Sequence, residues 1–243
     1  MKLLALIFDV DGTLAETERD GHRPAFNAAF AEAGLNWNWD VTLYGELLKV
    51  AGGKERIHHY AQHYDPALAA RPNFDSLVAK LHAVKTQRYL ALVEAGALCL
   101  RPGVARLLES ARAAGLRLAI ASTTTPINVT TLLRARLGTA APEGFDVIAA
   151  GDVVAAKKPA PDIYQYCLAQ LGLPASACLA IEDSAAVLAS AHAAGIPTLV
   201  TPSQYSRNQN FDHALAVLPD LGDTSLEQIR QLVSRSSSTA IPA

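Results

Sequence analysis

The spacing of apolar residues along the chain predicts two kinds of structure. Short apolar runs without alternation, typical of strands buried on both faces of a parallel sheet, occur near the N-terminus and through the second half. Between the later runs, apolar residues recur at helical spacing. Because strands and helices alternate over short links, we expect an α/β fold with a doubly wound, Rossmann-like parallel sheet. The strands are expected at residues 3–7, 116–121, 145–149, 178–181 and 196–200, with an edge strand at 214–218, and the helices at 127–137, 161–171, 185–194 and 226–233, with one more ending at 114.

The stretch between the first two strands has a different pattern. Apolar residues there follow only helical spacing, in segments 23–34, 40–50, 55–64 and 74–94. This pattern predicts a small all-helical domain inserted after the first strand. We expect residues 1–16 and 97–234 to form an α/β core domain, residues 17–96 to form the helical domain, and the Ser-rich residues 235–243 to form a disordered tail.

Composition limits the possible functions. Half of the 243 residues are apolar and 18% are charged, as in ordinary soluble globular proteins. The net charge of −2 offers no basis for binding nucleic acid or a membrane surface, and no apolar run approaches the roughly 20 residues of a membrane span. The N-terminus does not have the pattern of a signal peptide. Cys99, Cys167 and Cys178 lack CxxC spacing, which favours buried free thiols in a reducing compartment. We expect a cytoplasmic monomer that binds a small molecule.

Two acids directly follow the first predicted strand. Asp9 and Asp11 are two residues apart, so an extended backbone would point both side chains to one face, and Gly12 allows a sharp turn beyond them. Adjacent carboxylates repel each other unless a cation or a shared proton compensates. Taken alone, this segment could equally be a strand that ends in an acidic turn.

Three further polar clusters also follow predicted strands. Ser122 and Thr123 come after the second, Lys158 precedes a Pro-stiffened helix start, and Glu182 and Asp183 come after the fourth. Each cluster has an ordinary explanation, as a helix N-cap, an exposed loop or a solvated acid pair. Open α/β sheets, however, place their ligands at the carboxyl ends of the strands, where all these clusters would meet. Together with the first aspartate, the later acids would form an all-oxygen site suited to Mg²⁺.

The order and spacing of these clusters resemble the four motifs of the haloacid dehalogenase superfamily. The segment DVDGT after an N-terminal strand matches the first motif, and the helical insertion occupies the position of the cap domain in that family. Most members are phosphatases that work through an aspartyl-phosphate. The resemblance covers essentially the whole chain and implies a Mg²⁺-dependent phosphatase.

The resemblance also implies a role for each matched residue. Asp9 would be the nucleophile and a Mg²⁺ ligand, and Asp11 would act as general acid and base while offering its backbone carbonyl to the metal. Glu182 and Asp183 would complete the metal site. The residues that would hold the transferred phosphoryl group are Ser122, Thr123 and Lys158.

The helical insertion should select the substrate. A Gly-Gly turn followed by Lys54 and Arg56 at a helix start can bind an anion, although it could equally be a helix–helix turn with surface charges. The segments around residues 16–23, 37–40 and 52–57 resemble the CbbY branch, whose members hydrolyse xylulose-1,5-bisphosphate, an inhibitor of Rubisco in the Calvin cycle. Val187 departs from the branch, where Gly is common. The implied substrate-binding residues are Glu18, His22, Tyr44, Gly52, Gly53, Lys54, Glu55, Arg56, Lys85 and Thr124.

Other functions fit the same residues. A phosphosugar mutase of the β-phosphoglucomutase type shares the core motifs and a helical cap. Lys54 could instead form a Schiff base, as cap lysines do in related phosphonatases. A phosphosugar-binding regulator without catalysis would not need an acid–base residue such as Asp11.

Overall fold

The computed structural model describes residues 2–239 and shows two compact units. One unit comprises Met1–Glu16 and Cys99–Ala243, and the other comprises Thr17–Leu98. The second boundary lies between residues 98 and 99, two residues later than the predicted boundary between 96 and 97. The chain therefore leaves the first unit directly after the acidic turn and returns 82 residues later, since Thr17–Leu98 spans residues 17 to 98.

The first unit contains a six-stranded sheet in the order β3-β2-β1-β4-β5-β6, in which every pair of neighbours is parallel. This confirms the predicted α/β fold, including the edge strand. The first strand lies in the middle, between β2 and β4, and is completely buried. The strands are β1 (Ala5–Phe8), β2 (Arg117–Ser122), β3 (Val147–Ala150), β4 (Cys178–Glu182), β5 (Thr198–Val200) and β6 (Ala216–Val217).

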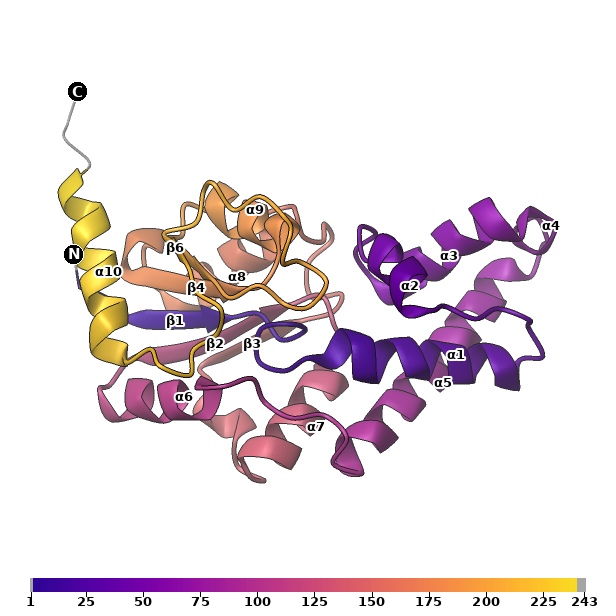
Figure 1. The fold of residues 1–243 in the computed structure, drawn as a ribbon, viewed down its shortest axis with the longest axis horizontal. Coiled ribbons are helices and arrows are strands. Elements are labelled where there is room, and N and C mark those ends of the chain that lie inside the picture. Colours follow the sequence, from indigo (N-terminus) through magenta and orange to yellow (C-terminus); the bar gives the residue numbers. More distant parts are fainter. Residues whose placement is uncertain (1, 240–243) are drawn as a thin grey trace. The chain divides into compact units, whose positions relative to one another are not determined.

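Helices cover both faces of this sheet (Figure 1), as the continuous apolar character of its strands predicts. In Figure 1, α8 and α9 lie above the strands, and α6 and α7 lie below them. Short 3₁₀ turns occur at Pro142–Gly144 and Ala175–Ala177. The helices are α6 (Val104–Ala113), α7 (Pro126–Leu137), α8 (Asp162–Leu171), α9 (Ala185–Ala193) and α10 (Leu226–Thr239).

The prediction of a disordered tail from residue 235 is wrong for the part that the structure describes. The last helix continues to Thr239 because nothing in its Ser-rich end breaks a helix, although serine is only a moderate helix former. The rest of the predicted tail, residues 240–243, lies outside the described residues.

The strand order positions the candidate site. From β1 the chain adds β2 and β3 on one side of the sheet, and it then crosses back to add β4, β5 and β6 on the other side, so the order of the strands reverses next to β1. Such reversal points leave a crevice at the carboxyl ends of the strands. The polar residues that follow β1, β2 and β4 are therefore brought to the same edge of the sheet.

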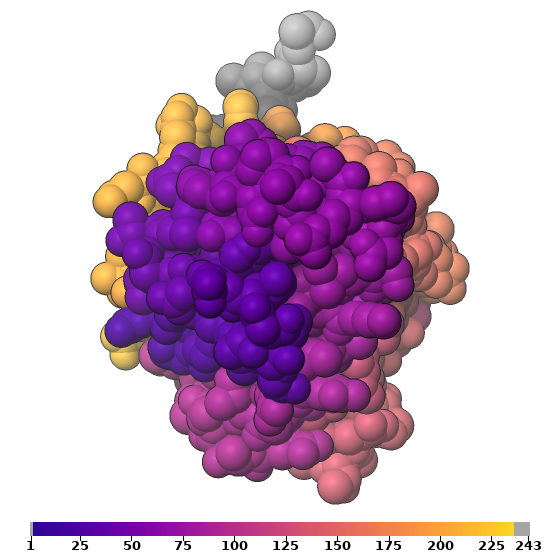
Figure 2. Space-filling view, turned by 90° about the vertical axis from the view of Figure 1, so that its right-hand side faces the viewer, coloured from indigo at the N-terminus to yellow at the C-terminus, as the bar shows by residue number. Residues whose placement is uncertain are grey.

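The second unit is entirely helical, as predicted. Two of its helical segments were not predicted from the sequence: a π-helical turn, Glu18–His22, which leads into α1, and the short α4, which Asp65 caps. Aromatic rings of Phe26, Phe30, Trp37 and Trp39 pack against one another in its core. Figure 2 shows one face of this unit, coloured indigo to purple. Its helices are α1 (Arg23–Glu32), α2 (Val41–Leu47), α3 (Gly53–Tyr64), α4 (Pro66–Ala69) and α5 (Phe74–Glu94).

The three cysteines are free thiols, but they do not share one environment. Cys167 and Cys178 are buried, and burial raises the pKa of the first to about 12 and that of the second to about 11. Cys99 is exposed, which corrects the prediction that all three are buried. It lies just after the boundary between the two units, in a segment that is neither helix nor strand. Within residues 2–239, no helix combines the length and apolar character needed to cross a membrane.

Candidate active site

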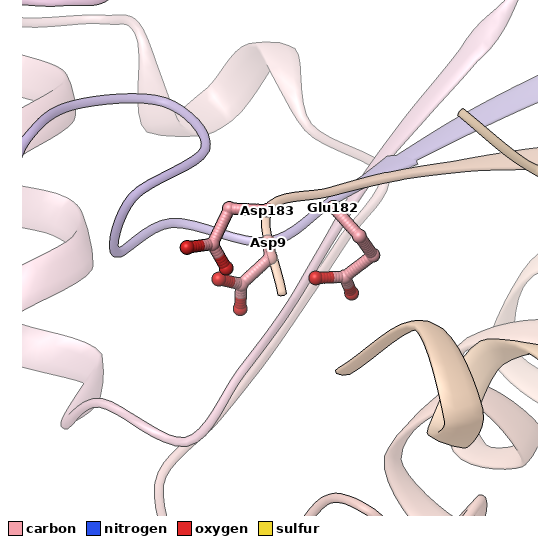
Figure 3. Close-up of side chains that lie close together, drawn as sticks. All are labelled: Asp9, Glu182 and Asp183. Carbon is pink, nitrogen blue, oxygen red and sulfur yellow. The ribbon is translucent and has the colours of Figure 1, made fainter. Parts of the chain in front are cut away.

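Three carboxylates gather where β1 and β4 end. Asp9 follows β1, Glu182 is the last residue of β4, and Asp183 comes next. One carboxylate oxygen from each lies within 4.8 Å of the others, and all three residues are buried. Figure 3 shows their side chains directed toward a common space. The parallel register of β1 and β4, with Phe8 opposite Ile181, accounts for this meeting of residues far apart in the sequence.

A buried lysine joins two of these acids. Lys158 Nζ lies 3.0 Å from Asp9 Oδ1 and 2.8 Å from Glu182 Oε1, and it also donates to the Tyr164 hydroxyl at 3.3 Å. Lys158 is 3% exposed, and its ammonium group lies 4.9 Å from the centre of the Tyr164 ring. The predicted lysine is therefore held at the acids rather than in a solvated loop.

The charges at this site are not balanced by the lysine alone. Burial raises the pKa of Glu182 well above its usual value, and it also raises the pKa of Asp9, to which Asp11 contributes. Although burial by itself would lower the pKa of Lys158, the charges of Asp9 and Glu182 raise it overall. One cation thus faces three clustered carboxylates. A second cation would lower the cost of keeping them ionised.

The donor set fits a hard divalent cation. All three residues offer carboxylate oxygens, the ligands that Mg²⁺ prefers. Glu182 Oε2 is buried and has no hydrogen-bond partner within the described part of the chain. A buried acceptor of this kind is costly when nothing satisfies it. The residues present therefore fit the metal that the sequence analysis expected.

Gly12 is required by the close packing behind the acids. Its φ is +82°, and a Cβ placed on it would lie 2.4 Å from Asp183 Oδ2 and 3.0 Å from the Ser203 Cβ. Any larger residue would combine left-handed backbone strain with displacement of the Asp183 carboxylate. The turn seen in the sequence is therefore also a packing requirement.

We expect Gly12→Ala to destabilise the protein by about 2–4 kcal/mol, from backbone strain and overpacking together. Gly115→Ala is a matched control, because Gly115 has a similar φ of +72° with nothing within 4 Å of its added Cβ. The control should lose only about 1 kcal/mol, the strain contribution. Urea unfolding followed by circular dichroism measures both, and equal losses would contradict this account of Gly12.

The remaining predicted core residues lie at the same edge. Asp11 is half-buried in the turn after β1, and its charge contributes to the raised pKa of Asp9. Ser122 ends β2 and is 1% exposed, and its Oγ accepts a hydrogen bond from the Thr124 backbone N–H at 3.3 Å. Thr123 is half-buried between them. Val187, in α9, is half-buried and does not belong to the acid cluster.

A serine pair that no pattern in the sequence indicates supports the backbone of Asp183. The buried Ser206 hydroxyl donates to the Asp183 carbonyl at 2.7 Å and accepts from the Ser203 backbone N–H at 2.8 Å. The buried Arg101 likewise donates to the carbonyls of Gly12 and Thr201. These bonds tie the turn after β1 to the loop after β5. No local sequence pattern marks the bonds to Asp183, Gly12 and Thr201, because each of them joins residues distant in the chain.

In the helical unit, three predicted residues form one network. The Tyr44 hydroxyl donates to Glu18, and Arg56 Nη1 donates to Tyr44 at 3.0 Å. Arg56 is 7% exposed and also donates to the carbonyls of Leu47 and Val50, at the end of α2. Its guanidinium group therefore holds the end of that helix in place, a structural role that its position in the sequence did not indicate.

Two other predicted residues share an aromatic environment. His22 stacks on the Tyr89 ring with centroids 4.1 Å apart, and Lys85 Nζ lies 4.9 Å from the centre of Phe26 and 5.6 Å from that of Tyr89. Both His22 and Lys85 are buried. The structure thus brings them into one cluster although 63 residues separate 22 from 85.

The Gly-Gly turn begins α3 as predicted. Gly52 has a φ of +94° and Gly53 is the first residue of the helix. The side chain of Glu55 folds back over Gly52, so that a Cβ there would lie 2.1 Å from Oε2. A carboxylate of the protein therefore already lies at this helix N-terminus, as the helix dipole favours. Lys54 is exposed beside it.

Comparisons with known proteins place these features in a family. A family model described as haloacid dehalogenase-like hydrolase matches residues 3–195. The chain is 55% identical over 219 residues to the plasmid-encoded protein CbbY of Cupriavidus necator, covering 90% of this chain and 86% of that protein.

Solved structures agree with this similarity. Two structures of CbbY from Rhodobacter sphaeroides, one in complex with phosphate and one of a variant in complex with xylulose-(1,5)bisphosphate, are 47% and 46% identical to the chain. Each has a TM-score of 0.84 and covers 91% of this chain and 96% of its own. β-Phosphoglucomutase from Clostridium difficile, at 18% identity and a TM-score of 0.80 over 97% of this chain and 99% of its own, shares the fold.

Proposed function

The chain belongs to the haloacid dehalogenase-like hydrolases, and on this premise we propose that it is a Mg²⁺-dependent phosphatase of the CbbY type. Its proposed reaction converts xylulose-1,5-bisphosphate and water into xylulose 5-phosphate and orthophosphate. The observation that carries the proposal is the buried cluster of Asp9, Lys158 and Glu182 beside Asp183, in a chain 55% identical to a CbbY protein. The proposed physiological role is removal of a Rubisco inhibitor in the cytoplasm.

In the proposed mechanism the chemistry begins at Asp9. Its carboxylate oxygen attacks phosphorus and forms an aspartyl-phosphate, while the bond from phosphorus to the sugar oxygen breaks. Asp11 donates a proton to that leaving oxygen, which removes the cost of expelling an alkoxide. Asp11 then takes a proton from the water that attacks phosphorus, and this step releases orthophosphate and restores Asp9.

The phosphoryl oxygens need positive charge and hydrogen-bond donors, since phosphoryl transfer depends chiefly on positioning and charge neutralisation. We assign these tasks to Lys158, which is already fixed beside Asp9 at 3.0 Å, and to Ser122 and Thr123 at the end of β2. The charges of Asp9 and Glu182 raise the pKa of the buried Lys158, which favours its charged ammonium form.

Mg²⁺ would be held by the carboxylates of Asp9, Glu182 and Asp183 and by the Asp11 backbone carbonyl. When bound, it supplies charge neutralisation that lets an anionic nucleophile approach an anionic phosphate. The serine pair behind Asp183 would keep that ligand in place.

Mg²⁺ is expected to raise the melting temperature by roughly 5–10 °C at a concentration about 100-fold above its Kd. The increase should be smaller at pH 5 than at pH 8, because burial raises the pKa of Asp9 and Glu182 and protons then compete with the metal. Differential scanning fluorimetry at both pH values tests this. Asp183→Asn should remove most of the increase, and an equal increase in that variant would argue against the assigned ligands.

The helical unit is proposed to select the sugar. Lys54 is an exposed cation at a helix N-terminus, and Glu18, His22, Tyr44 and Lys85 are polar groups in the two networks of that unit. We propose that they recognise the hydroxyls and second phosphate of the substrate, with Gly52, Gly53, Glu55 and Arg56 shaping the segment that carries Lys54.

Phosphate release with Mg²⁺, measured for xylulose-1,5-bisphosphate and ribulose-1,5-bisphosphate, tests the substrate. The proposal predicts a strong preference for the first. Slow release from a generic phosphate ester, with turnover of neither bisphosphate, would retain the reaction class and reject the substrate. Isomerisation of a hexose 1-phosphate without phosphate release would favour the mutase instead.

A further inference from the structure

A buried amide lies behind one of the hydroxyls that follow β2. Asn128, in the first turn of α7, is 1% exposed, and its Nδ2 donates to Thr124 Oγ1 at 3.0 Å. Thr124 is itself 9% exposed. Asn128 Oδ1 is buried and makes no hydrogen bond to any described residue. The two side chains therefore form a buried polar pair next to Ser122, the last residue of β2.

The N-terminus of α7 does not require an asparagine at position 128. Thr125 occupies the N-cap position and Pro126 the first turn, so the start of α7 is defined without it. Asparagine is a weaker helix former than leucine, and burying an amide whose oxygen is unpaired is unfavourable. An apolar residue of the same size would stabilise the helix better. The side chain is thus better explained by what it does to Thr124.

The hydrogen bond from Asn128 restricts the directions in which the Thr124 hydroxyl can donate its proton. A threonine hydroxyl has one proton to donate and lone pairs to accept with. Because the amide of Asn128 donates to Thr124 Oγ1, the hydroxyl proton is left to point toward another acceptor. Ser122 is arranged in the same way, since its Oγ accepts from the Thr124 backbone N–H. Both neighbouring hydroxyls therefore accept a hydrogen bond from the protein, which leaves the proton of each available for another acceptor.

We propose that Asn128 is a positioning residue that makes the Thr124 hydroxyl a hydrogen-bond donor to a phosphate group of the substrate. This inference rests on the proposed function, because it requires that the protein binds a phosphate ester. The inference adds Asn128 to the site. This residue does not belong to any of the four motifs, and it would act on the substrate only through Thr124. Hydrogen bonds to charged acceptors are stronger than neutral ones, so the direction of this proton should affect binding.

The test is a double-mutant cycle on Thr124→Val and Asn128→Leu, with kcat and KM measured for the phosphate ester that the wild type hydrolyses. Thr124→Val should raise KM about tenfold, the loss of one hydrogen bond to a charged group. Asn128→Leu should raise KM about threefold to tenfold with kcat within about threefold. In the Thr124→Val background, Asn128→Leu should have almost no further effect on KM, because the hydroxyl it orients is gone.

Two further variants separate positioning from structure. Asn128→Asp can only accept from Thr124, so it should raise KM more than Asn128→Leu does, and this excess should shrink in the Thr124→Val background. Thr130→Val is the control, because the Thr130 hydroxyl donates only to the Ile127 carbonyl of the same helix, and it should leave KM unchanged. A purely structural role would lower the active fraction, and therefore kcat, without changing KM.

The outcomes distinguish this inference from the proposed function. If the wild type hydrolyses the bisphosphate and Asn128→Leu keeps the wild-type KM, the inference is wrong and the function stands. Additive effects of Asn128→Leu and Thr124→Val would also overturn it. If the wild type hydrolyses only another phosphate ester, the proposed substrate is wrong, and the same cycle on that ester still decides the role of Asn128. Failure of the wild type to hydrolyse any phosphate ester would overturn both.

Discussion

Replacing Asp9 with asparagine is expected to lower phosphate release by about 10³-fold or more while leaving the protein folded. The amide cannot act as the nucleophile, and the two other carboxylates of the buried cluster, Glu182 and Asp183, come from the end of β4. The fold should tolerate the change, because asparagine has the same shape. The substitution also removes a carboxylate whose charged form is disfavoured, since burial raises the pKa of Asp9. Lys158 keeps its contact with Glu182.

Steady-state phosphate release and thermal unfolding of the same preparation check this expectation. Asp152→Asn is a suitable control, since Asp152 is an exposed aspartate that pairs with Lys157 outside the site. Its activity and stability should match those of the wild type. Activity of Asp9→Asn within about tenfold of the wild type would mean that a different group attacks phosphorus.

Lys158→Met should damage both stability and activity. Removing the ammonium group leaves Asp9 and Glu182 buried without their cation, and breaking a buried ion pair in this way costs about 3–5 kcal/mol. Phosphate release should also fall by about 100-fold or more, because the transition state loses a fixed positive charge. Urea unfolding in the absence of Mg²⁺ and phosphate release in its presence measure the two effects separately.

A second substitution tests the physical reason for the lost stability. In the double variant with Lys158→Met and Glu182→Gln, one of the two uncompensated charges is gone, so part of the stability should return while activity stays low. Lys157→Met, next in the chain, should cost at most about 1 kcal/mol, because the carboxylate that Lys157 contacts is exposed. If Lys158→Met were no less stable than Lys157→Met, the ion pairs at the centre of the site would not contribute as described.

The sequence by itself determined most of the elements and the residues of the candidate site. Apolar runs without alternation located the strands because a parallel sheet is covered on both faces, and helical spacing located the inserted unit. Asp9, Ser122 and Glu182 could be selected because each stands at the end of such a run. Parallel strands bring their carboxyl ends to one edge, so this position alone predicts that the three side chains lie near one another.

Only the tertiary structure decided how those residues are held and balanced. Lys158 could be placed at a loop by sequence, but its contacts with Asp9 and Glu182 arise from segments 149 and 24 residues away. The support from Ser206, the structural role of Arg56 and the amide behind Thr124 also depend on hydrogen-bond geometry. Hydrogen bonds are directional over about 3 Å, so side-chain identity and spacing do not specify them. The spacing of apolar residues indicates which face of a helix or strand is buried. The hydrogen-bond partner of each buried polar group depends instead on how the helices and strands pack against one another.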